Sequence, residues 1–228
     1  MKTNKLLVCN IMQFPEKISL FNAGIERQIK ASGIDAEYFE PTVLDIMDRV
    51  DSFSHLIISG SEASALDEMP WTDELENLIN LFVEKSKKIL AICYGHQFLA
   101  RVLGGKECVY KLAVPEYGYT QVKLSDHKLF KNISSPVCVQ LHNDAVHNLP
   151  DSFKIIAENE TSVQAIQYKG MDVYGLQFHP EFDIQATEYF LEQTRNSDPD
   201  FSNYYKCEYS SKEQLEQNGL FIKNFIEL

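Results

Sequence analysis

The chain has 228 residues, of which 44% are hydrophobic and 24% charged. This composition is ordinary for a globular protein, and the length suits one large core better than two full domains, so we expect a single domain over residues 1–228. Acidic side chains outnumber basic ones by 33 to 21, for a formal net charge of −12 at pH 7. Such a surface repels phosphate backbones and anionic lipid heads, so we expect neither nucleic acid nor a membrane as a partner.

Cysteine usage and the amino terminus indicate a reducing compartment. The five cysteines are odd in number, widely spaced and without a CxxC pair, which argues against a disulfide framework or a structural zinc site. We therefore expect no metal and no cofactor. The first apolar run is too short for a signal peptide, and no stretch approaches the roughly 18 to 20 apolar residues of a transmembrane helix. We expect a cytoplasmic protein.

Over the first hundred residues, apolar strand-like runs alternate with amphipathic helical ones. Short apolar runs predict strands at 6–12, 36–39, 55–59 and 89–92. Apolar residues at helical spacing predict helices at 18–31, 73–87 and 95–103. This alternation favours a doubly wound, mostly parallel sheet with helices on both faces.

The second half of the chain changes character. Five further strands are predicted with little helix between them, at 119–124, 137–142, 153–157, 165–168 and 173–178. They indicate an antiparallel extension of the sheet. Two late helices are predicted at 184–194 and 212–226, separated by a packed polar and aromatic loop at 196–211. We expect an α/β three-layer sandwich with a mostly parallel central sheet, flavodoxin-like in its first half.

The sequence Ile-Leu-Ala-Ile-Cys-Tyr-Gly-His-Gln, ending at Gln97, is the most informative segment. A predicted buried strand runs into Cys93, and a helix follows Gly95. A sharp strand-to-helix turn lifts its central side chain above the sheet edge and aims backbone N–H groups at the same point. Small residues at Ala91 and Gly95 fit so tight a turn, and the helix N-terminus favours the attacking thiolate. The alternative for this segment alone is a buried structural cysteine.

A second segment, Tyr-Gly-Leu-Gln-Phe-His-Pro-Glu, ends at Glu181. A predicted strand delivers His179 to its tip, and the carboxylate of Glu181 follows two residues later. A cysteine nucleophile needs a base within hydrogen-bond reach and an acceptor that fixes the tautomer of that base. We therefore expect His179 as the base and Glu181 as its orienting partner. A lone histidine at this position would more often be structural, but the nearby carboxylate weakens that interpretation.

A third segment, Ser-Gly-Ser at 59–61, follows a predicted strand. In an open α/β fold the ligand lies at the carboxyl edge of the sheet, where this loop should be. Its backbone at Gly60 and Ser61 can aim N–H groups at the oxyanion of an acyl-transfer intermediate. We expect an oxyanion hole from the N–H groups of Ser61 and Tyr94. A plain turn between a strand and a helix explains the composition equally well.

Together these segments resemble the class I (triad) glutamine amidotransferase family. CYGHQ is followed 86 positions after its cysteine by His-Pro-Glu, with SGS upstream. The likeness spans nearly the whole chain and is strongest to the stand-alone branch similar to the glutaminase domain of GMP synthase. It implies that Cys93 attacks a γ-glutamyl amide, that His179 relays the proton to the departing amine, and that a thioester is then hydrolysed.

The resemblance also implies residues that contact the substrate. Gln97 would grip the amino-acid end of the substrate. A Glu-x-Gly segment of the family matches Glu116, Tyr117 and Gly118, and a His-x-Asp-x-Val loop matches His142 and Asp144. All of these are expected to shape the substrate pocket.

In three places the sequence departs from the family pattern, and these departures limit how far the family's residue roles apply to this chain. Ala91 stands where typical members have glycine, which is a small change. The usual Gly-Gly-Pro loop reads Gly60-Ser61-Glu62, and we expect Glu62 to point away from the developing anion. A chain of this length is expected to hold only a glutaminase part, without a synthase domain.

Several functions stay open at this point. In one version, ammonia from glutamine passes to a separate synthase subunit. In another, the chain alone hydrolyses a γ-glutamyl conjugate, as a γ-glutamyl peptidase or γ-glutamyl-amine hydrolase. A non-catalytic regulatory or binding module on the same fold is the third alternative, and only Glu62 favours it. A redox sensor with an oxidisable cysteine is disfavoured, because it needs no oriented base.

Overall fold

The computed structural model describes residues 5–39, 44–134, 136–209 and 212–228. Its first half builds the parallel part of a large sheet. The strands β1 (Lys5–Cys9), β2 (Asp35–Phe39), β3 (His55–Ile58), β4 (Lys88–Ile92) and β10 (Val173–Leu176) lie in the order β2-β1-β3-β4-β10, all parallel. The central strands are apolar and buried throughout, as expected for strands covered on both faces.

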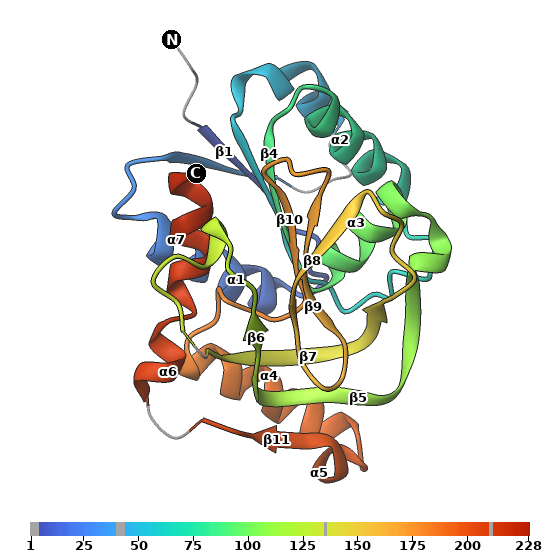
Figure 1. The fold of residues 1–228 in the computed structure, drawn as a ribbon, viewed down its shortest axis with the longest axis vertical. Coiled ribbons are helices and arrows are strands. Elements are labelled where there is room, and N and C mark those ends of the chain that lie inside the picture. Colours follow the sequence, from blue (N-terminus) through green and yellow to red (C-terminus); the bar gives the residue numbers. More distant parts are fainter. Residues whose placement is uncertain (1–4, 40–43, 135, 210–211) are drawn as a thin grey trace.

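Helices cover both faces of this sheet (Figure 1). One face carries α1 (Pro15–Ile29) and α7 (Gly219–Glu227), and the other carries α2 (Thr72–Glu84) and α3 (Tyr94–Gly104). Alternate residues of β1 explain the arrangement: Leu6 and Val8 join the core under α1 and α7, whereas Leu7 and Cys9 join the core under α2 and α3. The predicted three-layer α/β fold with a mostly parallel central sheet is confirmed.

The antiparallel extension is also present, but it takes only part of the second half of the chain. Next to β10 lie β9 (Val163–Tyr168), β8 (Phe153–Glu158) and the short β6 (Lys123–Leu124), all antiparallel to their neighbours. The remaining strands form a second sheet in the order β11-β5-β7, from β5 (Val109–Gln121), β7 (Val137–Val146) and β11 (Tyr205–Cys207). The predicted antiparallel extension of the sheet is therefore confirmed, and the second sheet is an addition that the sequence pattern did not indicate.

The segment over 196–211 is packed, as predicted, but it is not a loop throughout, and residues 210 and 211 lie outside the described part. A short helix, α5 (Phe201–Tyr204), leads into β11, which pairs in parallel with Tyr117–Tyr119 of β5. Gly118 permits this pairing, because its φ is +109° and an added Cβ would lie 2.1 Å from the carbonyl oxygen of Lys206. Aromatic packing of Phe201 against Tyr117 then holds the segment in place.

The late helices differ in detail from the prediction. Helix α4 (Ile184–Ser197) begins where predicted and runs three residues further. The predicted helix over 212–226 divides into α6 (Lys212–Glu216) and α7, and at the break Asn218 donates to the Val137 carbonyl at 2.9 Å. Three 3-10 helices that apolar periodicity did not indicate are η1 (Leu44–Ser52), η2 (Lys106–Cys108) and η3 (Lys128–Phe130).

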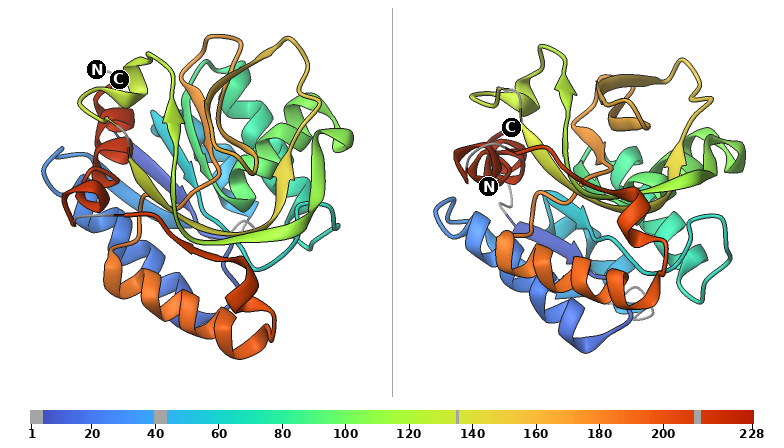
Figure 2. Two further views of the ribbon diagram at one scale, coloured as in Figure 1. Left: turned by 60° about the horizontal axis from the view of Figure 1, so that its bottom comes forward. Right: turned by 90° about the horizontal axis from the view of Figure 1, so that it is seen from below.

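Helix α4 runs alongside α1 in both views of Figure 2, so two segments far apart in sequence form one edge of the molecule. The segment between β10 and α4, which carries the His-Pro-Glu motif, lies against α1. Within the described ranges, no helix is both long and apolar enough to cross a membrane.

Candidate active site

Four chain segments meet at the carboxyl ends of the parallel strands. Met12, Gly60, Cys93 and His179 follow β1, β3, β4 and β10, respectively. An added Cβ on Gly60 would lie 3.0 Å from His179 Cε1 and 3.5 Å from Cys93 Cβ, so these three residues are immediate neighbours. Ligands in open α/β folds bind at this edge, where strand ends leave side chains and loop amides unobstructed.

Cys93 occupies a strained turn between β4 and α3. Its φ of 51° and ψ of −105° mirror an extended conformation, a region that L-residues rarely adopt. The turn is tight because α3 begins at the next residue: an added Cβ on Gly95 would lie 3.0 Å from the Ile58 carbonyl oxygen and 3.1 Å from that of Ser59. The backbone therefore has the nucleophile-elbow geometry that the sequence pattern predicts.

His179 is held between Glu181 and Cys93. Its Nδ1 lies 2.8 Å from Glu181 Oε1, and the Glu181 side chain is fully buried. Burial lowers the pKa of His179, but electrostatic interactions with Glu181 and Cys93, with hydrogen bonds to both, outweigh burial and raise that pKa to about 10. The ring also stacks on Phe182, with centroids 5.0 Å apart. The imidazole is thus fixed in orientation and favoured as imidazolium.

Helix α1 supports the backbone of the His-Pro-Glu segment. Arg27 donates to the Glu181 carbonyl at 3.1 Å, and Gln28 donates to the Pro180 carbonyl at 2.6 Å. The approach is closest at Gly24, where an added Cβ would lie 2.4 Å from the Glu181 carbonyl oxygen. A glycine in the middle of a helix weakens the helix, so this position is explained by close backbone contact.

The loop after β3 brings backbone donors close to Cys93. Within the described residues, the N–H groups of Ser61 and Tyr94 donate no hydrogen bond to the protein, so both are available to an oxyanion. The Glu62 carboxylate is paired with Lys17 at 3.0 Å and accepts from the backbone N–H of Gln13 at 3.0 Å. Its charge is therefore compensated by groups of α1 and the preceding loop, although the side chain still borders the cavity.

A cavity of about 530 Å³ opens above Cys93. Its walls include several residues that the sequence singled out, namely Ser61, Cys93, Tyr94, Gln97, Tyr117, His142, Asp144 and His179. At one end, Gln97 donates to the Asp144 carbonyl at 2.7 Å, and Ser64 donates to the Asp144 carboxylate at 2.5 Å. Tyr117 donates to Asn143 at 2.7 Å. This end is rich in groups that suit a charged amino-acid head.

Glu116 and Gly118, which were expected to contact the substrate, lie elsewhere. Glu116 is buried behind the cavity wall, where His142 donates to it at 3.0 Å. Burial raises the pKa of Glu116, but hydrogen bonds from His142, Thr120 and Asn159 outweigh burial and hold that pKa below its ordinary value. Gly118 lies against β11. Successive residues of a strand face opposite sides, so Tyr117 reaches the cavity while its two neighbours face away.

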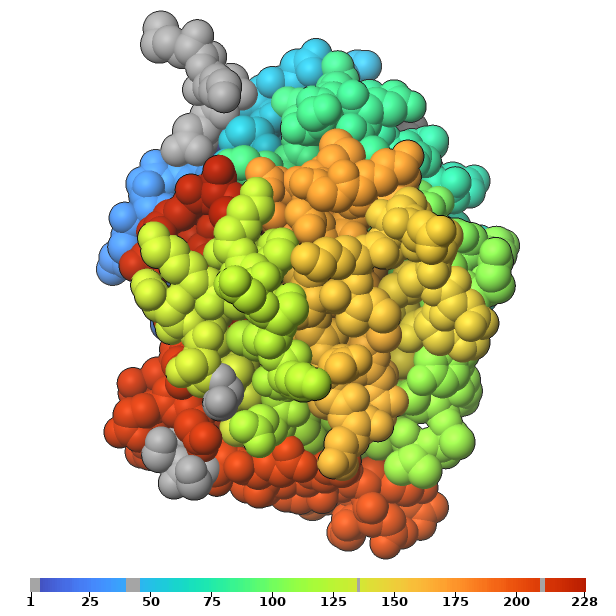
Figure 3. Space-filling view, viewed as in Figure 1, coloured from blue at the N-terminus to red at the C-terminus, as the bar shows by residue number. Residues whose placement is uncertain are grey.

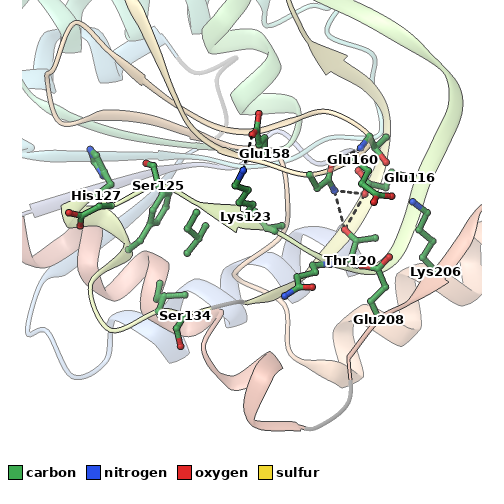
Figure 4. A pocket seen from close by; sticks show the side chains of 18 of the residues that line it. Glu116, Thr120, Lys123, Ser125, His127, Ser134, Glu158, Glu160, Lys206 and Glu208 are labelled. Atoms are coloured by element: carbon green, nitrogen blue, oxygen red, sulfur yellow. Dashed lines mark hydrogen bonds and ion pairs between the residues drawn. The ribbon is translucent and has the colours of Figure 1, made fainter.

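Glu116 borders a second, larger cavity of about 1050 Å³. This cavity lies where the 121–134 segment meets the end of β8, two parts that adjoin on the face shown in Figure 3. In Figure 4, Glu116 and Thr120 lie together at one end and His127 at the other, with Lys123 and Glu158 facing each other between them. His142 lines the smaller cavity, so the Glu116–His142 pair separates the two.

Sequence reasoning missed several residues that border or support the site. Arg101 is buried and donates to the carbonyls of Ala65 and Asp67, which fixes the loop that carries Ser64. Phe182 and Phe190 form an apolar wall beside His179. Only the unexpected glycine at position 24 carried a local signal, since a glycine inside a predicted helix indicates close packing.

The described residues contain no group of three or more histidine, cysteine, aspartate or glutamate side chains arranged to hold a metal ion.

Comparison with known proteins places this geometry in context. Residues 17–194 match the family model described as glutamine amidotransferase class-I. The chain is 31% identical over 179 residues to one subunit of the glutamine-hydrolysing GMP synthase of Sulfurisphaera tokodaii, a match that covers 77% of this chain and 90% of that subunit. It is 32% identical to the GMP synthase of Staphylococcus epidermidis but spans only 33% of its length. A crystal structure of a glutamine amidotransferase from Thermotoga maritima shares the fold, with a TM-score of 0.75 at 20% identity over 99% of both chains.

Proposed function

The chain belongs to the class I glutamine amidotransferase family, and on that basis we propose that it hydrolyses a γ-glutamyl amide through a thioester on Cys93. The observation that carries the proposal is the contact of the strained Cys93 turn with His179, whose other ring nitrogen binds buried Glu181. A nucleophile, a base and a group that orients the base thus converge at one point of the sheet edge.

The first half of the reaction forms the thioester. The Cys93 thiolate attacks the γ-carbonyl carbon, and the N–H groups of Ser61 and Tyr94 bind the oxyanion. His179 then gives its proton to the amide nitrogen, and the carbon–nitrogen bond breaks to release ammonia or an amine. Stacking on Phe182 and the hydrogen bond to Glu181 keep the imidazole aimed during this transfer.

The second half of the reaction hydrolyses the thioester and regenerates the free enzyme. Neutral His179 takes a proton from water, the resulting hydroxide adds to the thioester, and glutamate leaves as the thiolate reforms. Gln97, Tyr117, His142 and Asp144, with the loop around Ser64, form the end of the cavity that would receive the α-amino and α-carboxylate groups. Catalysis by a thiolate suits a reducing compartment, and a cytoplasmic location is part of the proposal.

The test is release of ammonia or amine by the purified chain from glutamine and from a panel of γ-glutamyl amides, with Cys93→Ala as control. Cys93-dependent turnover is the expected result. If no substrate turns over but a glutamine-analogue electrophile still labels Cys93, the nucleophile is competent and requires a partner. If labelling is also absent, the chain is a non-catalytic member of the family and the proposal is wrong.

A second candidate is a glutaminase subunit that supplies ammonia to a separate synthase. The likeness to a GMP synthase subunit of similar size favours it. The chain spans a third of the length of the longer GMP synthases. Their activity is therefore only a hypothesis for this chain. Stimulation of its glutaminase activity by an added synthase subunit would support this version. Full activity of the chain alone on a γ-glutamyl conjugate would favour the self-sufficient hydrolase.

A further inference from the structure

The cavity above Cys93 has two chemically different ends. The polar end lies around Gln97 and Asp144, where carbonyl, carboxylate, amide and hydroxyl groups cluster. The opposite end, beyond His179, is bordered by the apolar side chains of Met12, Phe182 and Phe190. Its polar members are the Lys17–Glu62 ion pair and the hydroxyls of Thr194 and Ser197, which already donate to carbonyls of α4. The nucleophile lies between the two ends. A γ-glutamyl amide has the same division, with a zwitterionic head on one side of the scissile bond and the substituent of the departing nitrogen on the other.

The apolar end is built by packing that also positions the base. Phe182 stacks on His179 at 5.0 Å between ring centroids, and Phe190 stacks on Phe182 at 4.5 Å. Phe190, Thr194 and Ser197 recur at spacings of four and three residues along α4, so they project from one face of that helix into the cavity. The amide nitrogen must take its proton from His179, so its substituent extends along this wall.

The charge at the apolar end is already balanced. Lys17 lies 3.0 Å from the Glu62 carboxylate, and its ammonium also lies over the Phe190 ring, 5.7 Å from the centroid. A carboxylate on the departing group would have to compete with Glu62 for this lysine. The wall therefore favours an amine with an uncharged apolar substituent over an amino acid.

We propose that the departing group of the natural substrate is an aromatic or branched aliphatic amine, bound by Phe182 and Phe190. This inference rests on the proposed thioester hydrolysis and specifies its substrate class. The Cys93 sulfur forms a bond to the γ-carbonyl carbon as the carbon–nitrogen bond breaks, and the amine leaves with the proton from His179. Water then hydrolyses the thioester to give glutamate. Ammonia, the departing group of glutamine, would leave the apolar end unused.

The experiment compares kcat/KM for L-glutamine, γ-L-glutamyl-phenethylamide and the dipeptide γ-L-glutamyl-L-phenylalanine. The last two compounds differ only by the carboxylate on the departing group. Burial of the phenyl ring is expected to give the phenethylamide an advantage of roughly tenfold or more over glutamine. The dipeptide is expected to be a poorer substrate than the phenethylamide, because Glu62 holds Lys17.

Two variants test the position of the aromatic wall. Phe190→Ala is expected to lower kcat/KM for the phenethylamide at least fivefold more than for glutamine. Phe14→Ala is the matched control, because Phe14 also contacts Lys17 but is 52% exposed and lies outside the cavity wall. Phe190 belongs to the core, so Thr194→Trp provides a second test by filling the apolar end. It is expected to reduce the phenethylamide-to-glutamine ratio of kcat/KM at least tenfold.

The outcomes separate the inference from the proposed function. If glutamine turns over with Cys93 dependence and the phenethylamide has no advantage, the inference is wrong and the proposed function stands. Preference for the dipeptide over the phenethylamide overturns the assignment of an uncharged amine. If no amide turns over, the inference is overturned, and labelling of Cys93 by a glutamine-analogue electrophile then decides whether the proposed function survives.

Discussion

The imidazole of His179 donates from Nδ1 to the buried Glu181 carboxylate at 2.8 Å, which leaves Nε2 to face Cys93. This bond fixes the tautomer of the neutral ring and stabilises the imidazolium. Together with the interaction with Cys93, it raises the pKa of His179 to about 10 against the opposing effect of burial. Under the proposed mechanism, His179 could then protonate the departing amide nitrogen over the whole neutral range of pH.

Glu181→Gln should move the alkaline limit of activity to lower pH. Removal of the carboxylate charge removes the first of the causes that raise the pKa of His179, so the imidazolium is lost at lower pH. We also expect kcat/KM for a γ-glutamyl amide to fall on the order of 10²- to 10⁴-fold. The measurement is the pH profile of kcat/KM from pH 6 to 10.5 for both proteins. An unchanged alkaline limb in the variant would contradict the assigned role.

The same pair makes stability depend on pH. His179 has a folded-state pKa of about 10, above its ordinary value of 6.5. Its contribution to stability is therefore fully present below pH 6.5 and is lost as pH rises towards 10. Urea unfolding at pH 6 to 10.5 should show the free-energy difference between wild type and His179→Gln shrinking across that window. A difference that grows with pH would mean that His179 is neutral in the folded protein.

Gly24→Ala should reduce activity through the backbone of Glu181. The new Cβ would lie 2.4 Å from the Glu181 carbonyl oxygen, so the His-Pro-Glu segment must shift. Misplaced catalytic groups are costly, and we expect kcat to fall roughly tenfold to a hundredfold. Gly219→Ala is the control, because its Cβ would meet only Gln28 Cδ at 3.9 Å. Equal activity of both variants would show that the contact relaxes without disturbing the base.

The strain at Cys93 predicts a difference between two inactive variants. The φ of 51° is costly for alanine but not for glycine. Cys93→Gly should therefore be more stable than Cys93→Ala by about 1 kcal/mol, after the entropy of glycine in the unfolded chain is subtracted. For a domain of this size the expected rise in Tm is about 2–4 °C. Thermal unfolding of the two proteins measures it, and a lower Tm for the glycine variant would argue against a strained turn.

Arg101 does not line the cavity, but Arg101→Lys should still weaken substrate binding. The guanidinium donates to the carbonyls of Ala65 and Asp67, and lysine cannot reproduce that fork. The loop carrying Ser64 would loosen, and KM for the γ-glutamyl substrate should rise about 3- to 10-fold with kcat little changed. Lys106→Ala is the control, since Lys106 is exposed and pairs with Glu68 at the surface. A loss confined to kcat would place the effect at the nucleophile instead.

Local patterns predicted the parallel half of the fold because each strand there is a short apolar run followed by an amphipathic helix. They also predicted Cys93 and His179 as neighbours, since both follow strands that end at one edge of the sheet. The second sheet was not predictable in this way. Residues 110–115 of strand β5 are half-buried or exposed and include Pro115, so this half of the strand lacks the apolar alternation of a strand.

Tertiary contacts account for the parts of the site that the sequence did not indicate. Arg101 supports the cavity from α3, and Phe190 lines it from α4. The apolar spacing of these helices predicts that one face is buried, but not which of its residues reach the site. Glu116 and Gly118 were predicted by likeness to a motif, but only Tyr117 between them reaches the cavity. The interpretation of residues 1–228 as one domain stays a prediction.

The Glu116–His142 pair has a consequence for how the two cavities respond to each other. Both ring nitrogens of His142 face oxygen atoms, those of the Glu116 carboxylate on one side and of the Asp144 carbonyl on the other. A cation bound in the larger cavity would compete for Glu116 and loosen this ring. Because His142 also lines the smaller cavity, we expect occupancy of the larger cavity to alter binding affinity in the smaller one.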